Sequence, residues 1–332
     1  MTKLEEDDVK IVAELPYKWD ILNNKTIMIS GGTGFIASFI ISVLMYRNKK
    51  YKQNIKVISL SRHGGISDEY ISNLKVDITL PIEYEGNADY ILHMASNTHP
   101  KQYADDPVGT ITTNVLGCNN LLVYAKNHNV KKFLLTSSVE IYGEGDIKPI
   151  TEKYSGYIDC NNARSGYNEA KRICEALCQS YRKQYGLSVV ICRLGRVFGA
   201  DKKKDSKAMS QFMDNAIKDK DIVLKSNGNQ RYSYCYVADA ASAIIFTLIS
   251  GIDGEAYNVS DDDENKTLGD YAEYIAQLAN RKVIYCIENN ESVSRATYAL
   301  LDTSRIKKIG WMPQFSVSDG LRRTYEIKKN RE

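Results

Sequence analysis

The sequence lacks several features that would place it outside ordinary globular α/β enzymes. Its seven cysteines form no Cys-x-x-Cys pair, and no histidine spacing completes a zinc site, so we expect free thiols and no metal. The formal net charge is only +3 and no long basic run occurs, which argues against a nucleic-acid partner. No apolar run is long enough to span a bilayer, and the acidic start is not a signal peptide. These absences predict a cytoplasmic protein without a membrane partner.

Strand-like and helix-like segments alternate along the chain. Short runs rich in β-branched and apolar residues are predicted strands, and longer periodic runs are predicted helices. This alternation predicts an α/β fold, a Rossmann-type doubly wound parallel sheet with a smaller C-terminal α/β substrate lobe. The predicted strands are 26–30, 55–60, 88–94, 132–137 and 188–193, and the predicted helices are 35–46, 110–126 and 167–185.

The same patterns divide the chain into three parts. Residues 1–24 form an N-terminal extension, whose apolar stripe ends before Pro16. Residues 25–200, with returning segments near 232–260, are expected to form the Rossmann domain. Residues 201–332 have a more irregular pattern and are expected to form most of the substrate-binding lobe.

A glycine-rich turn joins the first predicted strand to the first predicted helix of the sheet. Gly31, Gly34 and Ala37 recur at a spacing of three residues. Small residues permit the tight turn and let backbone N–H groups approach a pyrophosphate at the positive end of the helix. The strand before the turn and the helix after it make this a predicted NAD(P) site.

The end of the second predicted strand bears on the choice between NAD and NADP. An acidic residue there would bind the ribose hydroxyls of NAD, whereas an arginine would pair with the 2′-phosphate of NADP. The chain carries Ser61 and Arg62 at this place and no acid, which tilts the expectation slightly towards NADP. Asp77 is placed to meet the adenine edge.

A serine, a tyrosine and a lysine form the candidate catalytic set. Tyr167 and Lys171 are four residues apart, so they share one face of a predicted helix. The lysine is expected to lower the pKa of the tyrosine and to hold the nicotinamide ribose, and the tyrosine to accept a proton from a sugar hydroxyl. Ser138, at a hydroxyl-rich strand end, is expected to hydrogen-bond the same substrate oxygen.

These motifs together resemble the extended short-chain dehydrogenases of the nucleotide-sugar epimerase/dehydratase family. The resemblance runs from Thr26 to near Tyr325 and includes residues 91–96, 113–122 and 230–239. It implies an enzyme that acts on a sugar nucleotide with tightly bound, recycled NAD or NADP. The cofactor residues that it implies are Gly31, Thr33, Gly34, Phe35, Ile36, Ser61, Arg62, Asp77, Ile78, Met94, Ala95, Ser96, Asn114, Tyr167 and Lys171.

The reaction implied by the resemblance proceeds through a 4-keto sugar. Glu140, two residues after Ser138, is the candidate general acid or base for the later step, or else a structural carboxylate. Val139 replaces the aspartate of dTDP-glucose dehydratases and cannot donate a proton, which disfavours that subtype. The pattern resembles more closely the UDP-glucuronate decarboxylase and GDP-mannose dehydratase types.

Candidate substrate residues complete the set. Arg164, three residues before the catalytic tyrosine, could hold a carboxylate or phosphate through a bidentate fork, or only stabilise its loop. Arg196 stands where related enzymes usually carry an asparagine that touches the sugar nucleotide, so the pocket is expected to differ in size and charge. The resemblance implies that Arg231, in the segment 230–239, binds the diphosphate of the substrate, and that Asn97 is a further substrate contact.

The sequence therefore predicts a decarboxylase or dehydratase of sugar nucleotides. A 4-epimerase, a 4-keto-sugar reductase and a non-catalytic Rossmann protein that senses cofactor ratio are the alternatives. The resemblance also implies a homodimer formed through the helices at 110–126 and 167–185.

Overall fold

The computed structural model describes residues 1–65, 67–96, 104–143, 149–202, 207–261, 266–287 and 298–331. Its centre is a seven-stranded parallel sheet in the order β11-β6-β5-β4-β1-β2-β3. These strands are β1 (Thr26–Ser30), β2 (Lys56–Ser61), β3 (Ile71–Lys75), β4 (Tyr90–His93), β5 (Lys132–Ser138), β6 (Val189–Leu194) and β11 (Ala256–Val259).

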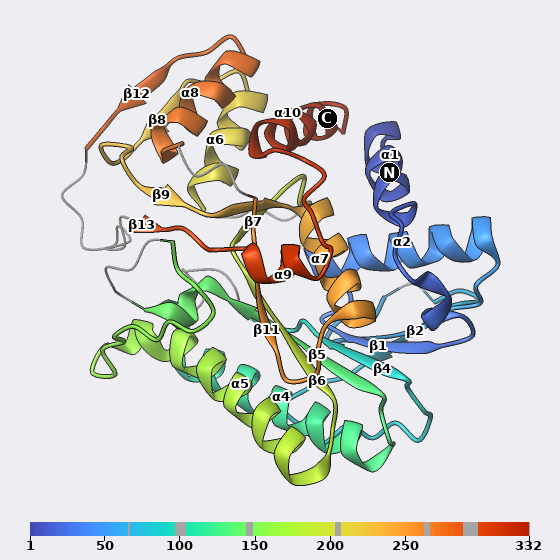
Figure 1. Cartoon of the computed structure of the whole chain (residues 1–332). Helices are drawn as coiled ribbons and strands as arrows, with labels where there is room; N and C mark the ends of the chain where they lie inside the picture. Colours follow the sequence, from blue (N-terminus) through green and yellow to red (C-terminus); the bar gives the residue numbers. More distant parts are fainter. Residues whose placement is uncertain are drawn as a thin grey trace.

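Helices cover both faces of this sheet, which confirms the doubly wound Rossmann-type prediction (Figure 1). Alternate residues of a strand point to opposite faces. Ile27 and Ile29 of β1 belong to the core on the side of α2 (Phe35–Tyr51) and α7 (Val237–Ser250), whereas Met28 belongs to the core beneath α4 (Pro107–Asn127) and α5 (Gly166–Tyr185).

Two helices are longer than their sequence patterns predict. The helix α2 continues to Tyr51 because its polar residues are satisfied inside the protein: Arg47 donates to Gln53, and Asn48 exchanges two hydrogen bonds with the backbone of Ile55. The helix α4 begins at Pro107, where Asp106 accepts the backbone N–H of Gly109 as an N-cap.

A second, smaller layer of strands and helices lies beyond the carboxyl side of the sheet (Figure 1). Three parallel strand pairs build it: β10 with β7, β12 with β8, and β13 with β9. The strands are β7 (Arg196–Phe198), β8 (Ile222–Leu224), β9 (Arg231–Tyr232), β10 (Tyr234–Tyr236), β12 (Val283–Tyr285) and β13 (Tyr298–Ala299). The helices beside them are α6 (Ala208–Ile217), α8 (Leu268–Leu278), α9 (Ser304–Lys308) and α10 (Val317–Lys329). The division of the chain into domains stays a prediction.

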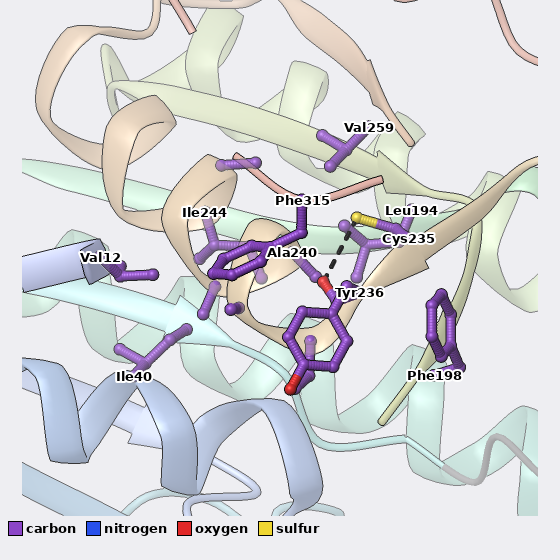
Figure 2. Packing of buried hydrophobic residues seen from close by; sticks show 14 of the residues in the cluster. Val12, Ile40, Leu194, Phe198, Cys235, Tyr236, Ala240, Ile244, Val259 and Phe315 are labelled. Atoms are coloured by element: carbon purple, nitrogen blue, oxygen red, sulfur yellow. Dashed lines mark hydrogen bonds between the residues drawn. The ribbon is translucent and has the colours of Figure 1, made fainter. Parts of the chain in front are cut away.

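The N-terminal extension folds as α1 (Lys3–Ala13) and the short η1 (Trp19–Leu22). Thr2 and Glu5 cap α1 reciprocally, each side chain accepting the other residue's backbone N–H. Val12 of α1 points towards Ile40 of α2 and Ile244 of α7 in the packed core (Figure 2). The extension is therefore part of the hydrophobic core.

A buried carboxylate ties α1 to the second layer. Asp8 is only 1% exposed, and it accepts a hydrogen bond from the Tyr236 hydroxyl (2.6 Å) and pairs with Arg323 of α10. Burial raises the pKa of Asp8, while the hydrogen bond from Tyr236 and the charge of Arg323 act in the opposite direction. Tyr236 also packs edge-on against Phe315, with ring centroids 5.3 Å apart (Figure 2).

No helix in these described ranges is both long and apolar enough to cross a membrane. Within the same ranges, no group of three or more His, Cys, Asp or Glu side chains could hold a metal ion.

Replacing Asp8 with alanine tests the tie between α1 and the second layer. The change leaves the Tyr236 hydroxyl and the Arg323 guanidinium without their shared acceptor, so we expect a loss of about 3 kcal/mol in the free energy of unfolding. Urea unfolding followed by circular dichroism measures it. Asp7→Ala, at the exposed neighbouring position, is the matched control and should unfold like the wild type. Equal stability of both variants would contradict a stabilising role for Asp8.

Candidate active site

The candidate site lies at the carboxyl ends of the central strands. The strand order reverses between β1 and β4, because the chain runs from β1 outwards to β3 and then returns to β4 on the other side of β1. Ligands of open α/β sheets bind in the crevice at such a switch point. The glycine turn follows β1 at this edge, and Met94, Ala95 and Ser96 follow β4.

The backbone of the glycine turn approaches the end of β4 too closely for side chains. Gly31 has a positive φ of 71°, and a Cβ there would lie 2.9 Å from Ala95 Cα. A Cβ on Gly34 would lie 2.9 Å from the carbonyl oxygen of Gly31. Gly34 is the N-cap of α2 and has no side chain to cap it, and the first helical hydrogen bond is donated by Ser38. The N–H groups of the first turn, including Phe35 and Ile36, are therefore suited to an anionic ligand.

The hydroxyl of Ser30 joins the ends of β1 and β4. It accepts the backbone N–H groups of Met94 (3.0 Å) and Ala95 (3.1 Å) and lies 2.8 Å from Nδ1 of His93. With its acceptor capacity used, the hydroxyl must donate to Nδ1, so the neutral ring carries its proton on Nε2. Burial, and next the charge of Lys171, lower the pKa of His93 to about 3, which keeps the ring neutral at physiological pH.

The end of β2 and the segment after β3 form the outer part of the predicted cofactor groove. Asp77 accepts the backbone N–H and the hydroxyl of Thr79, which lower its pKa, and the charge of the exposed Arg62 lowers it further. Ser61 donates to the carbonyl of Gly64. The buried Ile78 lies under α4, and its carbonyl accepts from the Asn120 side chain. Arg62 and Asp77 are thus neighbours, and a preference for NADP stays a prediction.

Tyr167 is buried, and of the candidate catalytic residues only Lys171 is less exposed. Tyr167 lies in the first turn of α5 and is 6% exposed. Side-chain hydrogen bonds with Ser138 and Ser96 act on its phenol, and Glu140 is close enough for its charge to act there too. The Ser96 hydroxyl also donates to Oδ1 of the buried Asn114 (2.9 Å). The structure therefore brings residues from the ends of β4 and β5, from α4 and from α5 together around one phenol.

Burial, and not the charge of Lys171, has the largest effect on the pKa of Tyr167 in the protein alone, and the role expected of Lys171 stays a prediction. Burial raises the pKa of Tyr167 to about 12; hydrogen bonds with Ser138 and Ser96 lower it only in part, and the negative charge of Glu140 raises it. Lys171 Nζ lies 5.9 Å from the centre of the tyrosine ring and donates to the carbonyl of Thr136 (3.0 Å). Burial also lowers the pKa of Lys171, so desolvation governs both residues.

Glu140 is held at the site by the short helix η2 (Val139–Tyr142). The Ser138 hydroxyl caps this helix by accepting the N–H of Glu140, and the amide of Asn168 donates to the Glu140 carbonyl (2.9 Å). Arg172 donates to the carbonyl of Ile141 (2.7 Å). Two residues of α5 therefore fix the loop that carries Glu140 relative to Tyr167 on the same helix.

Behind this loop, a buried polar network links α5 to the rest of the sheet. Arg193 of β6 pairs with Glu175 of α5 (2.6 Å) and donates to the Tyr142 hydroxyl (3.0 Å). Tyr142 donates in turn to Asn258 of β11 (2.5 Å), whose amide donates to the carbonyls of Ile150 and Asp302. Burial raises the pKa of Tyr142 to about 12, so its hydroxyl remains a donor at physiological pH.

The candidate substrate residues are spread over several elements. Arg164 is exposed in η3 (Ala163–Ser165), just before α5. Arg196 begins β7, and its guanidinium carbon lies 3.7 Å from the centre of the Tyr232 ring. Arg231 of β9 lowers the pKa of Asp270 through its charge, after the larger effect of the Thr267 backbone hydrogen bond. Asn97 lies outside the described residues.

Several residues at the site were not singled out from the sequence. Each of them makes a hydrogen bond in which one partner is a backbone group. The Ser30 hydroxyl accepts a backbone N–H, the carbonyl of Thr136 accepts from Lys171, and Asn168 and Arg172 donate to backbone carbonyls. Such bonds follow from how distant segments meet, and they leave no spacing pattern in the sequence.

This arrangement defines a class: a Rossmann-type enzyme with a dinucleotide turn and a serine–tyrosine–lysine set. A family model described as "NAD dependent epimerase/dehydratase family" matches residues 27–260. The chain belongs to this family, which confirms the resemblance inferred from the sequence.

Curated relatives and solved structures agree with the assignment. The chain is 32% identical to UDP-glucuronic acid decarboxylase 3 of Arabidopsis thaliana, over 90% of this chain and 87% of that protein. It is 29% identical to the dTDP-D-glucose 4,6-dehydratase of Dictyostelium discoideum, over 78% and 64% of the two chains. The fold is shared with the UDP-glucose 4-epimerase of Thermotoga maritima, at a TM-score of 0.79 and 21% identity over 92% of this chain and all of that one.

The residues at the switch point fit the NAD(P) cofactor that the family uses. Because Gly31 and Gly34 have no side chains, the turn leaves room for a pyrophosphate. No side chain caps the start of α2, so its first N–H groups can donate to that ligand. When bound, the oxidised cofactor supplies a hydride acceptor. That Lys171 and Tyr167 hold the nicotinamide end stays a prediction.

Gly34→Val tests the position of the cofactor. The branched side chain would fill the space beside the Gly31 carbonyl, where backbone has to meet phosphate, so cofactor retained on purification should fall to a few per cent of the wild-type amount. Absorbance and mass spectrometry of the released nucleotide measure it. Ser38→Val, at an exposed position of the same helix, is the control for a branched side chain in the first turns of α2. Normal cofactor content in Gly34→Val would mean that the site is misplaced.

Proposed function

We propose that this enzyme decarboxylates a UDP-linked uronic acid through a 4-keto intermediate. The observation that carries the proposal is the similarity, over about nine-tenths of the chain, to proteins named UDP-glucuronic acid decarboxylases. Tyr167 is hydrogen-bonded to Ser138, and Lys171 Nζ lies 5.9 Å from the centre of the tyrosine ring. Val139 in place of an acidic residue supports decarboxylation over a dehydration that needs that acid.

The chemistry requires few groups from the protein. Removal of hydride from C4 of the sugar, with loss of the hydroxyl proton to Tyr167, makes a C4 ketone. The carboxylate on C5 is then that of a β-keto acid, so its C–C bond breaks to release carbon dioxide and leave an enolate. Protonation of C5 gives the 4-keto pentose, and return of the hydride to C4 leaves the cofactor unchanged. Tightly bound, recycled NAD or NADP is part of this proposal.

Each protein group has a defined part in this scheme. Ser138 orients the C4 oxygen while Tyr167 takes its proton, and Lys171 stabilises the negative charge on that side of the site. The pKa of Tyr167 is about 12 in the protein alone, so its phenol is neutral there, and the positive charge that the oxidised cofactor would supply when bound would favour its ionisation. Glu140 acts only after oxidation, on the 4-keto sugar, and decarboxylation needs little help from it because a β-keto acid loses carbon dioxide readily.

Dehydration is the second candidate, because the Glu140 carboxylate lies near Tyr167 and could serve the extra proton transfer that dehydration needs. Epimerisation, reduction of a 4-keto sugar and cofactor sensing without turnover are the remaining alternatives. The mass of the product separates decarboxylation from dehydration, and a new isomer of unchanged mass identifies epimerisation. Decarboxylation removes 44 mass units and dehydration 18, whereas epimerisation removes none.

We also propose that the enzyme is a cytoplasmic homodimer. All seven cysteines are free thiols, as expected in a reducing compartment. Five apolar side chains on the outer faces of the neighbouring helices α4 and α5 are at least 39% exposed, and two copies could bury them in a four-helix interface. These residues are Val108, Ile111, Leu116, Val123 and Ile173.

Tyr167→Phe and Glu140→Gln separate the two stages of the reaction. Tyr167→Phe should lower both transient cofactor reduction and product formation by about 100-fold or more, the usual effect of losing a general base. Glu140→Gln should retain transient reduction, with only a mild loss of product if decarboxylation is the reaction. Single-turnover absorbance of the reduced nicotinamide with product mass spectrometry measures both.

Tyr157→Phe, at a tyrosine that is 66% exposed, is the matched control and should behave like the wild type. Fast and complete hydride transfer in Tyr167→Phe would refute the role of this residue. A severe loss of product in Glu140→Gln, with an 18-unit mass change in the wild type, would favour dehydration instead.

The dimer is tested by light scattering at micromolar concentration. The wild type should have twice the mass of the chain, and Leu116→Arg should be a monomer because it buries an unpaired charge in the interface. Ile284→Arg, at an apolar residue of β12 that is 44% exposed against 45% for Leu116, should remain a dimer. A monomeric wild type would contradict the proposal.

A further inference from the structure

The N-terminal extension, residues 1–24, contacts both layers of the molecule. Its helix α1 packs against α2 and α7, which cover one face of the sheet, and against α10 of the second layer (Figure 1). The candidate site lies at the carboxyl ends of the sheet strands, and the second layer lies beyond that side. An element that contacts both layers can therefore set how closely the second layer approaches the site.

The part of the extension that follows α1 is fastened to α2 and to the residues just after it. Trp19 is 4% exposed, and the guanidinium carbon of Arg47 lies 4.6 Å from the centre of its ring. The same arginine donates to the carbonyl of Ala13 (3.1 Å), and the Gln53 amide donates to the carbonyl of Trp19 (3.1 Å). This end of the extension is therefore held by aromatic packing and by buried hydrogen bonds.

The first two turns of α1 are fastened to the second layer by two carboxylates. Asp8 accepts from the Tyr236 hydroxyl of β10 and pairs with Arg323 of α10, and Glu5 pairs with Arg331, which follows α10. The side chains of these four charged residues are at most 24% exposed. Charges that are largely removed from water attract each other more strongly than surface pairs do, so these contacts hold α1 against the second layer.

One of these contacts reaches the segment beside the glycine turn. Arg331 also donates to the carbonyl of Ala200 (2.7 Å), two residues after the end of β7. The residue between, Gly199, lies against the ring of Phe35 in the first turn of α2, and a Cβ on it would lie 2.7 Å from Phe35 Cζ. Glu5 is thus linked, through Arg331, to the place where the second layer meets the start of α2.

We infer that residues 1–24 act as a strap that holds the second layer closed over the candidate site. Aromatic and apolar groups anchor one end of the strap on the sheet side, whereas Glu5 and Asp8 hold the other end on the second layer. The ligand that gains from closure is a nucleoside diphosphate or its sugar derivative, and in this respect the inference rests on the proposed function. Release of Glu5 and Asp8 lowers the fraction of closed protein, and the apparent affinity for that ligand falls in proportion.

Hydrogen exchange of the purified protein, without added nucleotide, tests whether the strap holds the second layer. Glu5→Gln combined with Asp8→Asn removes the two charges and keeps the size of both side chains. The amides of α10 and β10 should then exchange about tenfold faster within the first minutes, whereas those of the buried strands β4 and β5 should not change. Glu6→Gln combined with Asp7→Asn, at exposed positions of the same helix, is the matched control and should exchange like the wild type.

Two adjacent arginines of α10 give a second comparison. Arg323→Gln should act like the double variant, because Asp8 loses its ion pair. Arg322→Gln should change the exchange by no more than about twofold, since the ion pairs of Arg322 with Asp319 and Glu326 stay within α10. Unchanged exchange of α10 and β10 in the double variant, or an equal increase in β4 and β5, would overturn the inference.

Calorimetric titration of UDP into the purified holoenzyme tests the effect of the strap on the site. The double variant at Glu5 and Asp8 should bind UDP about 3- to 10-fold more weakly, with unchanged cofactor content, and the control at Glu6 and Asp7 should bind like the wild type. Equal UDP affinity in both double variants would overturn closure over the site. If the wild type does not bind UDP, the proposed class of substrate fails, while the exchange comparison still decides whether the strap holds the second layer.

Discussion

The structure of the candidate site depends on the junction that Ser30 makes between β1 and β4. Its hydroxyl accepts two backbone N–H groups after β4 and donates to His93, so all three hydrogen-bonding positions of one small side chain are used. This junction brings Ala95 so close to Gly31 that a Cβ would not fit, and it directs the following residue, Ser96, towards Tyr167. The cofactor turn and the catalytic phenol are thus positioned by the same contact.

Desolvation is the dominant electrostatic effect at this site. It raises the pKa of Tyr167 to about 12 and lowers the pKa of Lys171, so in the protein alone both groups are displaced towards their neutral forms. The carboxylate of Glu140 opposes ionisation of the phenol further. Burial, and not the spacing of Tyr167 and Lys171 alone, therefore has the largest effect on the ionisation of the phenol in the protein alone.

Much of the sheet was predictable from the sequence, because its central strands are buried on both faces and appear as continuous apolar runs. The edge strand β3 had no predicted range, since its residues are only partly buried and their pattern is mixed. The positions of Gly31, Gly34, Tyr167 and Lys171 follow from local spacing within one turn or one helix. The direction of the pKa shift of Tyr167 could not be predicted from this spacing, because the burial of Tyr167 depends on how β4, α4 and α5 meet. The stacking of the Arg196 guanidinium on the Tyr232 ring likewise depends on the pairing of strands that are far apart in the sequence.

Polar contacts on two sides of the site join the two layers of the molecule. Arg193 and Tyr142 connect the helix of Tyr167 to Asn258, and Asn258 holds the backbone at Ile150 and Asp302. On the opposite flank, Asp8 binds Tyr236, which lies on the strand paired with the one that Arg196 begins. Buried hydrogen-bonded groups of this kind are costly to separate, because each would be left without a partner. The second layer is consequently held in register with the sheet, and Arg196 keeps a fixed relation to Ser138 although the two residues belong to different layers.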